Sequence, residues 1–171
     1  LWDEDPREVV PDEAAKSIGA EDTFGEDLAG AAALERELLA QAARVGRRLR
    51  AAGAAGRVVT LKVKYADFSL VTRRATLERP SDDDRAIFEA GRALLQRVDL
   101  RAPVRLTGIS VSGLAGEAER HQLELFAPAR PESAEEGKRK ALNTARDRLA
   151  DRFGEGAVVP ADLAGTPPRR R

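Results

Sequence analysis

Residues 59–77 read VTLKVKYADFSLVTRRATL, two runs rich in β-branched and apolar residues on either side of a short polar turn. In the first run, apolar and polar residues alternate with the period of a half-buried strand, which places on one face Val59, Leu61, Val63 and Tyr65. Residues 66–69 predict the turn, and a second strand follows over residues 69–78. Because so short a turn joins antiparallel neighbours, the stretch predicts a hairpin. The sequence does not determine which face of the second strand is buried, since Arg73 falls in phase with the apolar residues around it.

Patterned segments flank this hairpin on both sides. Residues 16–24 and 103–113 predict strands, and in the latter the apolar phase slips at Gly108, which indicates a β-bulge between the pairs Val104, Leu106 and Ile109, Val111. Residues 27–52 predict a long amphipathic helix. A second helix opens at residues 80–84 (PSDDD), where Ser81 can cap and the acids favour the positive end of the helix dipole. Its core stripe is Ile87, Gly91, Leu94, Leu95 and Val98.

The order of these elements is strand, helix, strand, strand, helix, strand. Each helix supplies a right-handed crossover, so the pattern predicts an α+β domain with a four-stranded, antiparallel-containing sheet and both helices on one face. The other face is expected to meet solvent, with Thr60, Lys62 and Lys64 on the second strand and Arg105 and Thr107 on the last.

The chain turns polar beyond residue 116, apart from an apolar cluster at residues 122–126 (QLELF). Residues 134–153 predict a C-terminal helix whose apolar stripe is Leu142, Ala145, Leu149 and Phe153. We therefore expect an acidic tether (1–15), one domain (16–115), a linker (116–133), a helix with a short extension (134–159) and a disordered tail (160–171). Because the first residue is not Met, we expect a piece of a longer protein.

The residue types restrict the chemistry. The chain has no Cys and one His, His121, which excludes disulfides, thiolate metal sites and nucleophilic triads. The acids at residues 82–84 are explained more simply by a helix start than by a metal site, so we assign no metal and no catalytic residue. No apolar run approaches the roughly 20 residues that span a bilayer. We expect a cytoplasmic monomer that makes no membrane contact.

The net charge of zero hides a segregation along the chain. Residues 1–30 carry two basic and ten acidic side chains, whereas residues 31–116 carry sixteen basic and nine acidic ones. The middle segment is basic, as a phosphate-binding domain would be.

Four stretches carry a resemblance to a known family: residues 16–24 (KSIGAEDTF), 59–77, 104–114 (VRLTGISVSGL) and 122–126. Together they resemble the Y-family translesion DNA polymerases of the bacterial DNA polymerase IV type. The resemblance covers about residues 5–126, with a weaker similarity in residues 141–154. It implies a DNA-gripping little finger domain, joined by a tether to palm, fingers and thumb domains that carry the catalytic carboxylates and magnesium. This chain would then have no enzymatic activity and no cofactor of its own, while the parent is a DNA-directed DNA polymerase that acts in DNA repair.

The resemblance adds partners and sites. Primer-template DNA is the expected partner of the basic sheet face, since phosphates bind cationic side chains and small donors. The expected contacts are Lys16, Ser17, Gly19, Lys62, Lys64, Thr72, Arg73, Arg74, Thr76 and Arg105. Relatives often carry a basic residue at the position of Ala75, where Arg74 can compensate.

Residues 122–126 resemble the motif that binds the bacterial sliding clamp. In that motif the glutamine, here Gln122, makes amide hydrogen bonds, and the apolar side chains, here Leu123, Leu125 and Phe126, fill a hydrophobic pocket. The alternative is a short edge strand or loop that packs on its own domain.

Two other functions stay in view. The parent could be a catalytically inactive paralogue that serves as an adaptor for the clamp and partner polymerases. The domain could also be an RNA-binding or ligand-binding ferredoxin-like module. Sheet-surface RNA readers stack bases on aromatic residues of central strands, whereas the only aromatic residue of the last three predicted strands, Tyr65, points to the core by its phase.

Overall fold

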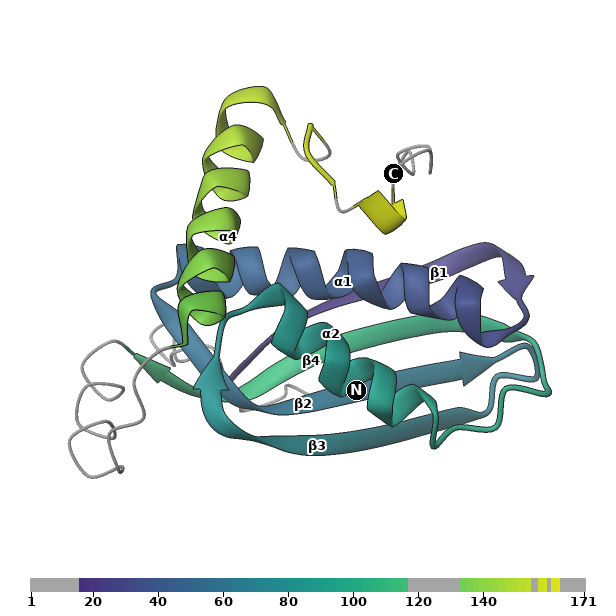
Figure 1. Ribbon diagram of the computed structural model, residues 1–171. Coiled ribbons are helices and arrows are strands. Elements are labelled where there is room, and N and C mark those ends of the chain that lie inside the picture. The colour runs from purple at the N-terminus through teal and green to yellow at the C-terminus, as the bar shows by residue number, and fades with distance from the viewer. Residues whose placement is uncertain (1–15, 117–132, 155–156, 160, 164–171) are drawn as a thin grey trace, which may run out of the picture.

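The computed structural model describes residues 16–116, 133–154, 157–159 and 161–163. Its elements are β1 (Ser17–Leu28), α1 (Ala31–Ala51), β2 (Ala54–Tyr65), β3 (Leu70–Ser81), α2 (Asp84–Leu95), β4 (Val104–Gly116), α4 (Ala134–Phe153) and the 3-10 turn η1 (Ala161–Leu163). The strands form one sheet in the order β1-β4-β2-β3, with every neighbouring pair antiparallel. Both α1 and α2 lie on one side of this sheet (Figure 1). The predicted α+β fold and element order are therefore confirmed.

The hairpin that the sequence predicts joins β2 to β3. The Tyr65 amide donates to the Ser69 carbonyl at 3.0 Å, and the Phe68 amide donates back to the Tyr65 carbonyl at the same distance. The register pairs Leu61 with Arg73 and Lys62 with Thr72, which fixes the faces of β3. Arg73 lies on the helix side, and its neighbour Arg74 lies on the opposite face.

The core lies between the sheet and the two helices. The stripe predicted for α2 is buried as expected, and Gly91 permits close packing because a Cβ there would lie 2.7 Å from Cδ1 of Ile109. On α1, Gln41 is fully buried, and its Nε2 donates to the carbonyl and the Oγ1 of Thr107, each at 3.0 Å. The largest fully buried apolar side chains are Leu34, Leu38, Leu49, Leu61, Ile87, Leu94, Leu95 and Ile109.

The structure corrects the predicted phase of β4. The irregularity lies at Arg105, not at Gly108, because Leu106 pairs with Lys64 while Val104 pairs with Tyr65. The extra residue turns Leu106 to the face opposite the helices, although the side chain is still only 9% exposed. Thr107, which was expected on the solvent face, is buried on the helix side.

Two helix starts also differ from the prediction. α1 begins at Ala31, four residues later than expected, because β1 continues to Leu28. The N-cap of α2 is Asp83, whose side chain accepts a hydrogen bond from the Arg85 amide at 3.3 Å. The predicted cap, Ser81, instead accepts from the Asp83 amide at 3.1 Å.

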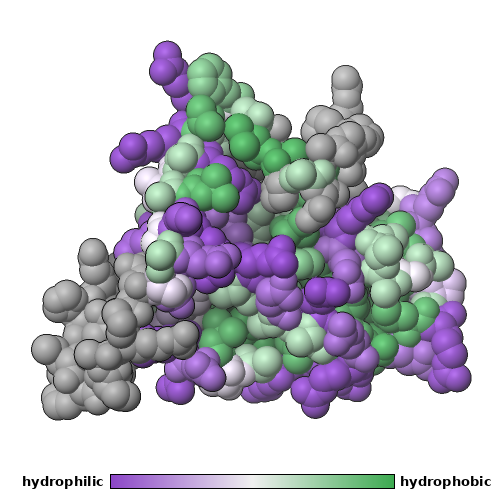
Figure 2. All heavy atoms as spheres, in the orientation of Figure 1, coloured by the Kyte–Doolittle hydropathy of each residue, from purple (hydrophilic) through white to green (hydrophobic). Residues whose placement is uncertain are grey.

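The C-terminal helix α4 has the predicted bounds, but the side of the helix that faces the domain is opposite to the predicted one. Its polar side faces the α1–α2 layer, whereas the predicted apolar stripe is exposed, with Leu142 at 58% and Phe153 at 63%. Figure 2 shows hydrophobic surface over α4. No helix among the described residues is both long enough and apolar enough to cross a membrane.

Candidate nucleic-acid interface

One face of the sheet is free of both helices, and we call it the open face. Alternation along each strand sends every second side chain to it. Its members are Ser17, Gly19, Glu21 and Thr23 of β1, Leu106, Gly108, Ser110 and Ser112 of β4, Val58, Thr60, Lys62 and Lys64 of β2, and Leu70, Thr72, Arg74 and Thr76 of β3. Seven predicted DNA contacts are among them, namely Ser17, Gly19, Lys62, Lys64, Thr72, Arg74 and Thr76.

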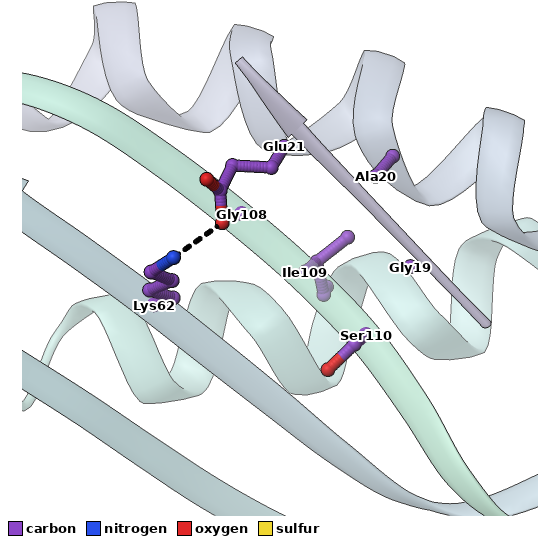
Figure 3. Close-up of a pocket in the computed structure, with 7 residues that line it drawn as sticks. All are labelled: Gly19, Ala20, Glu21, Lys62, Gly108, Ile109 and Ser110. Carbon is purple, nitrogen blue, oxygen red and sulfur yellow. Dashed lines mark hydrogen bonds and ion pairs between the residues drawn. The ribbon is translucent and has the colours of Figure 1, made fainter. Parts of the chain in front are cut away.

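The centre of the open face consists of small residues. A shallow hollow of about 230 Å³ lies over β1 and β4, lined by Gly19, Ala20, Glu21, Lys62, Gly108, Ile109 and Ser110 (Figure 3). A Cβ on Gly19 would lie 2.9 Å from Cβ of Ser110, and one on Gly108 would lie 3.2 Å from Cβ of Glu21. Because Gly19 carries no side chain, a ligand backbone can approach β1 closely at that position.

An ion pair crosses this hollow. Lys62 Nζ lies 2.7 Å from Oε2 of Glu21, reaching across β4 where Gly108 leaves room (Figure 3). Both side chains are about two-fifths exposed, so the pair adds at most about 1 kcal/mol to stability. A phosphate that binds Lys62 would compete with Glu21, a carboxylate that the sequence patterns did not place on this face.

Of the five other predicted cationic residues, two lie on the open face and three lie elsewhere. Lys64 and Arg74 have no carboxylate partner within the part of the chain that the structure describes. Arg73 lies on the helix side of β3, but this is an edge strand, so the side chain is exposed, and its Nη1 donates to the Thr72 carbonyl at 3.1 Å. Arg105 sits at the irregularity of β4, 4.0 Å from Oδ1 of Asp27. Lys16 lies just before β1 and is exposed.

Sequence reasoning missed Phe68 at the tip of the hairpin. Its side chain is 60% exposed, and its ring lies 4.9 Å from Nζ of Lys64 and 5.1 Å from Cζ of Arg105. An aromatic residue inside a four-residue polar turn was the signal that could have identified it. The predicted clamp-binding residues, Gln122, Leu123, Leu125 and Phe126, lie outside the described residues.

Asp83 and Asp84, two of the three acids at residues 82–84, do not fit a metal ion, because groups of the chain itself occupy their carboxylates. Asp84 accepts from Nη1 of Arg50 at 2.8 Å and from Nη1 of Arg146 at 3.0 Å, while Asp83 accepts from Nδ2 of Asn143 at 3.0 Å. Burial raises the pKa of Asp84, so these guanidinium groups favour its charged form against that effect. The side-chain oxygens of Asp83 and Asp84 therefore bind cationic and amide groups of the chain itself. They hold α4 against the start of α2.

Comparisons with known proteins show the family of the chain. Residues 15–125 match the impB/mucB/samB family C-terminal domain. DNA polymerase IV of Desulfatibacillum aliphaticivorans is 44% identical over 160 residues, and DNA polymerase IV of Streptomyces coelicolor is 43% identical over 132 residues. These alignments cover 93% and 77% of this chain, but only 39% and 27% of the relatives.

The fold recurs in solved polymerase structures. A post-insertion binary complex of Dbh DNA polymerase matches with a TM-score of 0.52 at 13% identity, over 59% of this chain and 29% of that one. A Y-family DNA polymerase chimera also reaches 0.52, at 18% identity, over 64% of this chain and 32% of that one. With the family match, these findings assign the chain: it belongs to the impB/mucB/samB family, whose C-terminal domain it contains, and it is similar in sequence to DNA polymerase IV.

Proposed function

We propose that this chain holds a translesion DNA polymerase on primer-template DNA and that the open face grips the duplex. The composition of that face carries the proposal. Glycine and serine occupy its centre, and Lys64 and Arg74 lie beside them without a carboxylate partner among the described residues. Cationic side chains bind phosphates, and small residues let the DNA backbone come close to strand amides. Lys16, Arg73 and Arg105 would add contacts at the edges of the face.

Such binding depends on salt more than on sequence. Each phosphate contact contributes about 0.9 to the slope of log K against log salt for duplex DNA. Replacing both Arg73 and Arg74 with Ala should therefore flatten the slope measured by fluorescence anisotropy, by about 0.9 for each phosphate that the variant no longer binds. The matched control is Arg36→Ala with Arg97→Ala, because both side chains are exposed and neither belongs to the open face.

The two single variants make the test sharper. Arg74 lies on the open face and Arg73 on the helix side of the same strand, so Arg74→Ala should have the larger effect. Equal slopes for the wild type and the Arg73, Arg74 double variant, with folding intact, would place the DNA surface elsewhere.

We infer that nucleotide incorporation belongs to the full-length polymerase, which would use magnesium bound by residues other than those described. Asp83 and Asp84, the acids that cluster in the sequence, are occupied by Arg50, Arg146 and Asn143. The isolated chain should extend no primer in the presence of Mg²⁺ or Mn²⁺. Extension above a buffer control would overturn this inference.

A further inference from the structure

The tip of the β2–β3 hairpin has an unusual backbone. Phe68 has a φ of 66°, and no other non-glycine residue in the described part of the chain has a positive φ. Bulky side chains rarely adopt this region, because it brings Cβ close to the backbone, and such residues tend to cluster at binding sites. Glycine would fit here without strain. A ring at this position therefore needs an explanation other than turn geometry.

Local hydrogen bonds hold the backbone of the turn around Phe68 in this conformation. Oδ1 of Asp67 accepts from the Ser69 amide at 2.9 Å and from the Ser69 hydroxyl at 2.6 Å. These bonds lower the pKa of the Asp67 carboxyl and favour its charged, accepting form. With the two backbone bonds between Tyr65, Phe68 and Ser69, they close the turn on both sides of Phe68.

The ring gains little from burial in its own domain. Its side chain is 60% exposed and the neighbouring Leu70 is 55% exposed. Lys64 and Arg105 place their charges within cation–π distance of the ring, at 4.9 and 5.1 Å. The tip thus presents one aromatic ring flanked by two cations, at the end of the open face that carries Lys64.

We propose that Phe68 is a stacking platform for an unpaired base of single-stranded DNA and that Lys64 and Arg105 bind the phosphates on either side of that base. Aromatic rings combined with cationic side chains are the usual means of binding single strands, because every base offers a π face. A base inside a duplex is covered by its neighbours, so the platform selects an unpaired one. This inference rests on the proposed function, since the open face would deliver the single strand that extends from a bound duplex.

Binding to two matched probes tests the proposal with the full chain. One probe is a blunt DNA duplex, and the other is the same duplex with a 5′ single-stranded overhang that carries 2-aminopurine at successive positions. We expect the overhang to bind more tightly and the fluorescence of 2-aminopurine to change at one position. Phe68→Leu, which keeps an apolar side chain and removes the ring, should weaken overhang binding by about 5- to 150-fold, the range for loss of one stacked base. Blunt-duplex binding should stay unchanged.

Three variants control for folding and for apolar contact. Phe68→Trp should retain overhang binding, since it keeps an aromatic face. Phe68→Gly removes the ring and suits the positive φ, so it should lose overhang binding while the hairpin stays folded. Leu142→Ser changes an apolar side chain of similar exposure on α4, outside the open face, and should leave overhang binding as in the wild type.

The outcomes separate this inference from the proposed function. If the wild type binds the blunt duplex and the overhang adds nothing, the stacking platform is refuted and DNA binding by the open face survives. The same holds if Phe68→Leu weakens both probes equally, which would indicate a general apolar contact such as one with another protein. If the wild type binds neither probe, the proposed function fails as well.

Discussion

Gly46 lies where α1 packs against the start of α2, and its missing side chain is required there. A Cβ at this position would lie 2.0 Å from Oδ1 of Asp84 and 3.0 Å from the carbonyl oxygen of Asp82. Gly46→Ala should therefore displace Asp84 from its contact with Arg50 and lower the free energy of unfolding by about 1–3 kcal/mol, the usual cost of overpacking. Urea denaturation followed by circular dichroism measures this change.

Gly25→Ala is the matched control for Gly46→Ala. Gly25 lies in β1, has no positive φ, and a Cβ there would meet nothing within 4 Å. Its substitution should leave stability unchanged or raise it slightly, because alanine restricts the unfolded chain. A loss of stability as large at Gly25 as at Gly46 would contradict the steric explanation.

Single residues also show where sequence patterns reach their limit. Alternation predicted the face of Lys62 and Lys64 correctly, because the apolar residues that alternate with them, Leu61 and Val63, are fully buried in β2. It predicted the wrong face for Leu106 and Thr107, because one extra residue at Arg105 shifts the phase of β4 and leaves no sign in the hydrophobic pattern. The face of Arg73 depends on pairing with Leu61, and only the register of the hairpin determines that pairing.

Among the elements, α4 is held by charged and polar groups. Arg50 of α1 donates to Asp147 of α4 at 2.6 Å and to Asp84 at 2.8 Å. Burial opposes the charge of Arg50, but the hydrogen bonds to Asp147 and Asp84 outweigh that effect and raise the pKa of its guanidinium. Arg47 adds an exposed ion pair with Asp151 at 2.8 Å. The helix should therefore dissociate from the domain more readily at high salt than the sheet unfolds.

Arg146→Ala tests this attachment. The change removes one of the two guanidinium groups on buried Asp84 and should weaken α4 docking by about 1.5–3 kcal/mol, the range for hydrogen bonds to charged groups. Hydrogen exchange should show faster exchange of α4 amides with the sheet unchanged. Arg148→Ala is the control, because Arg148 is exposed on the same helix and has no ion pair among the described residues. Similar exchange in both variants would contradict the proposed role of Arg146.

The bounds of α4 could be predicted from sequence, and its orientation could not. Ser133 and Glu136 form a capping box at its start, and Gly154 follows its end, which are local signals. Its packing depends on Asp83 and Asp84, about 60 residues earlier in the chain. The apolar stripe of α4 therefore predicted the wrong side of the helix as the one that faces the domain. For α2, in contrast, local and long-range packing agree, and the predicted stripe is buried.

At the scale of the whole molecule, the fold separates two surfaces. The helices cover one face of the sheet and leave the other free of helices, while α4 stands on the helix side (Figure 1). Residues 122–126 lie in sequence between β4 and α4, so a clamp bound there would contact the chain between the sheet domain and the C-terminal helix. The proposed contacts with DNA and with the clamp would then lie at different places on one chain.

We therefore predict that residues 122–126 bind the bacterial sliding clamp as an extended peptide. Burying Leu123, Leu125 and Phe126 in a partner pocket can contribute about 1.5–3 kcal/mol each, and ordering the peptide consumes part of this, so micromolar affinity is expected. Calorimetry should compare the intact chain with Leu125→Ala plus Phe126→Ala, and with a chain that ends after Pro128. Binding by the double variant as tight as that of the wild type would refute the assignment. Tighter binding by the shortened chain would show that α4 and the residues around it restrict access to the motif, whereas weaker binding would show that they contact the clamp.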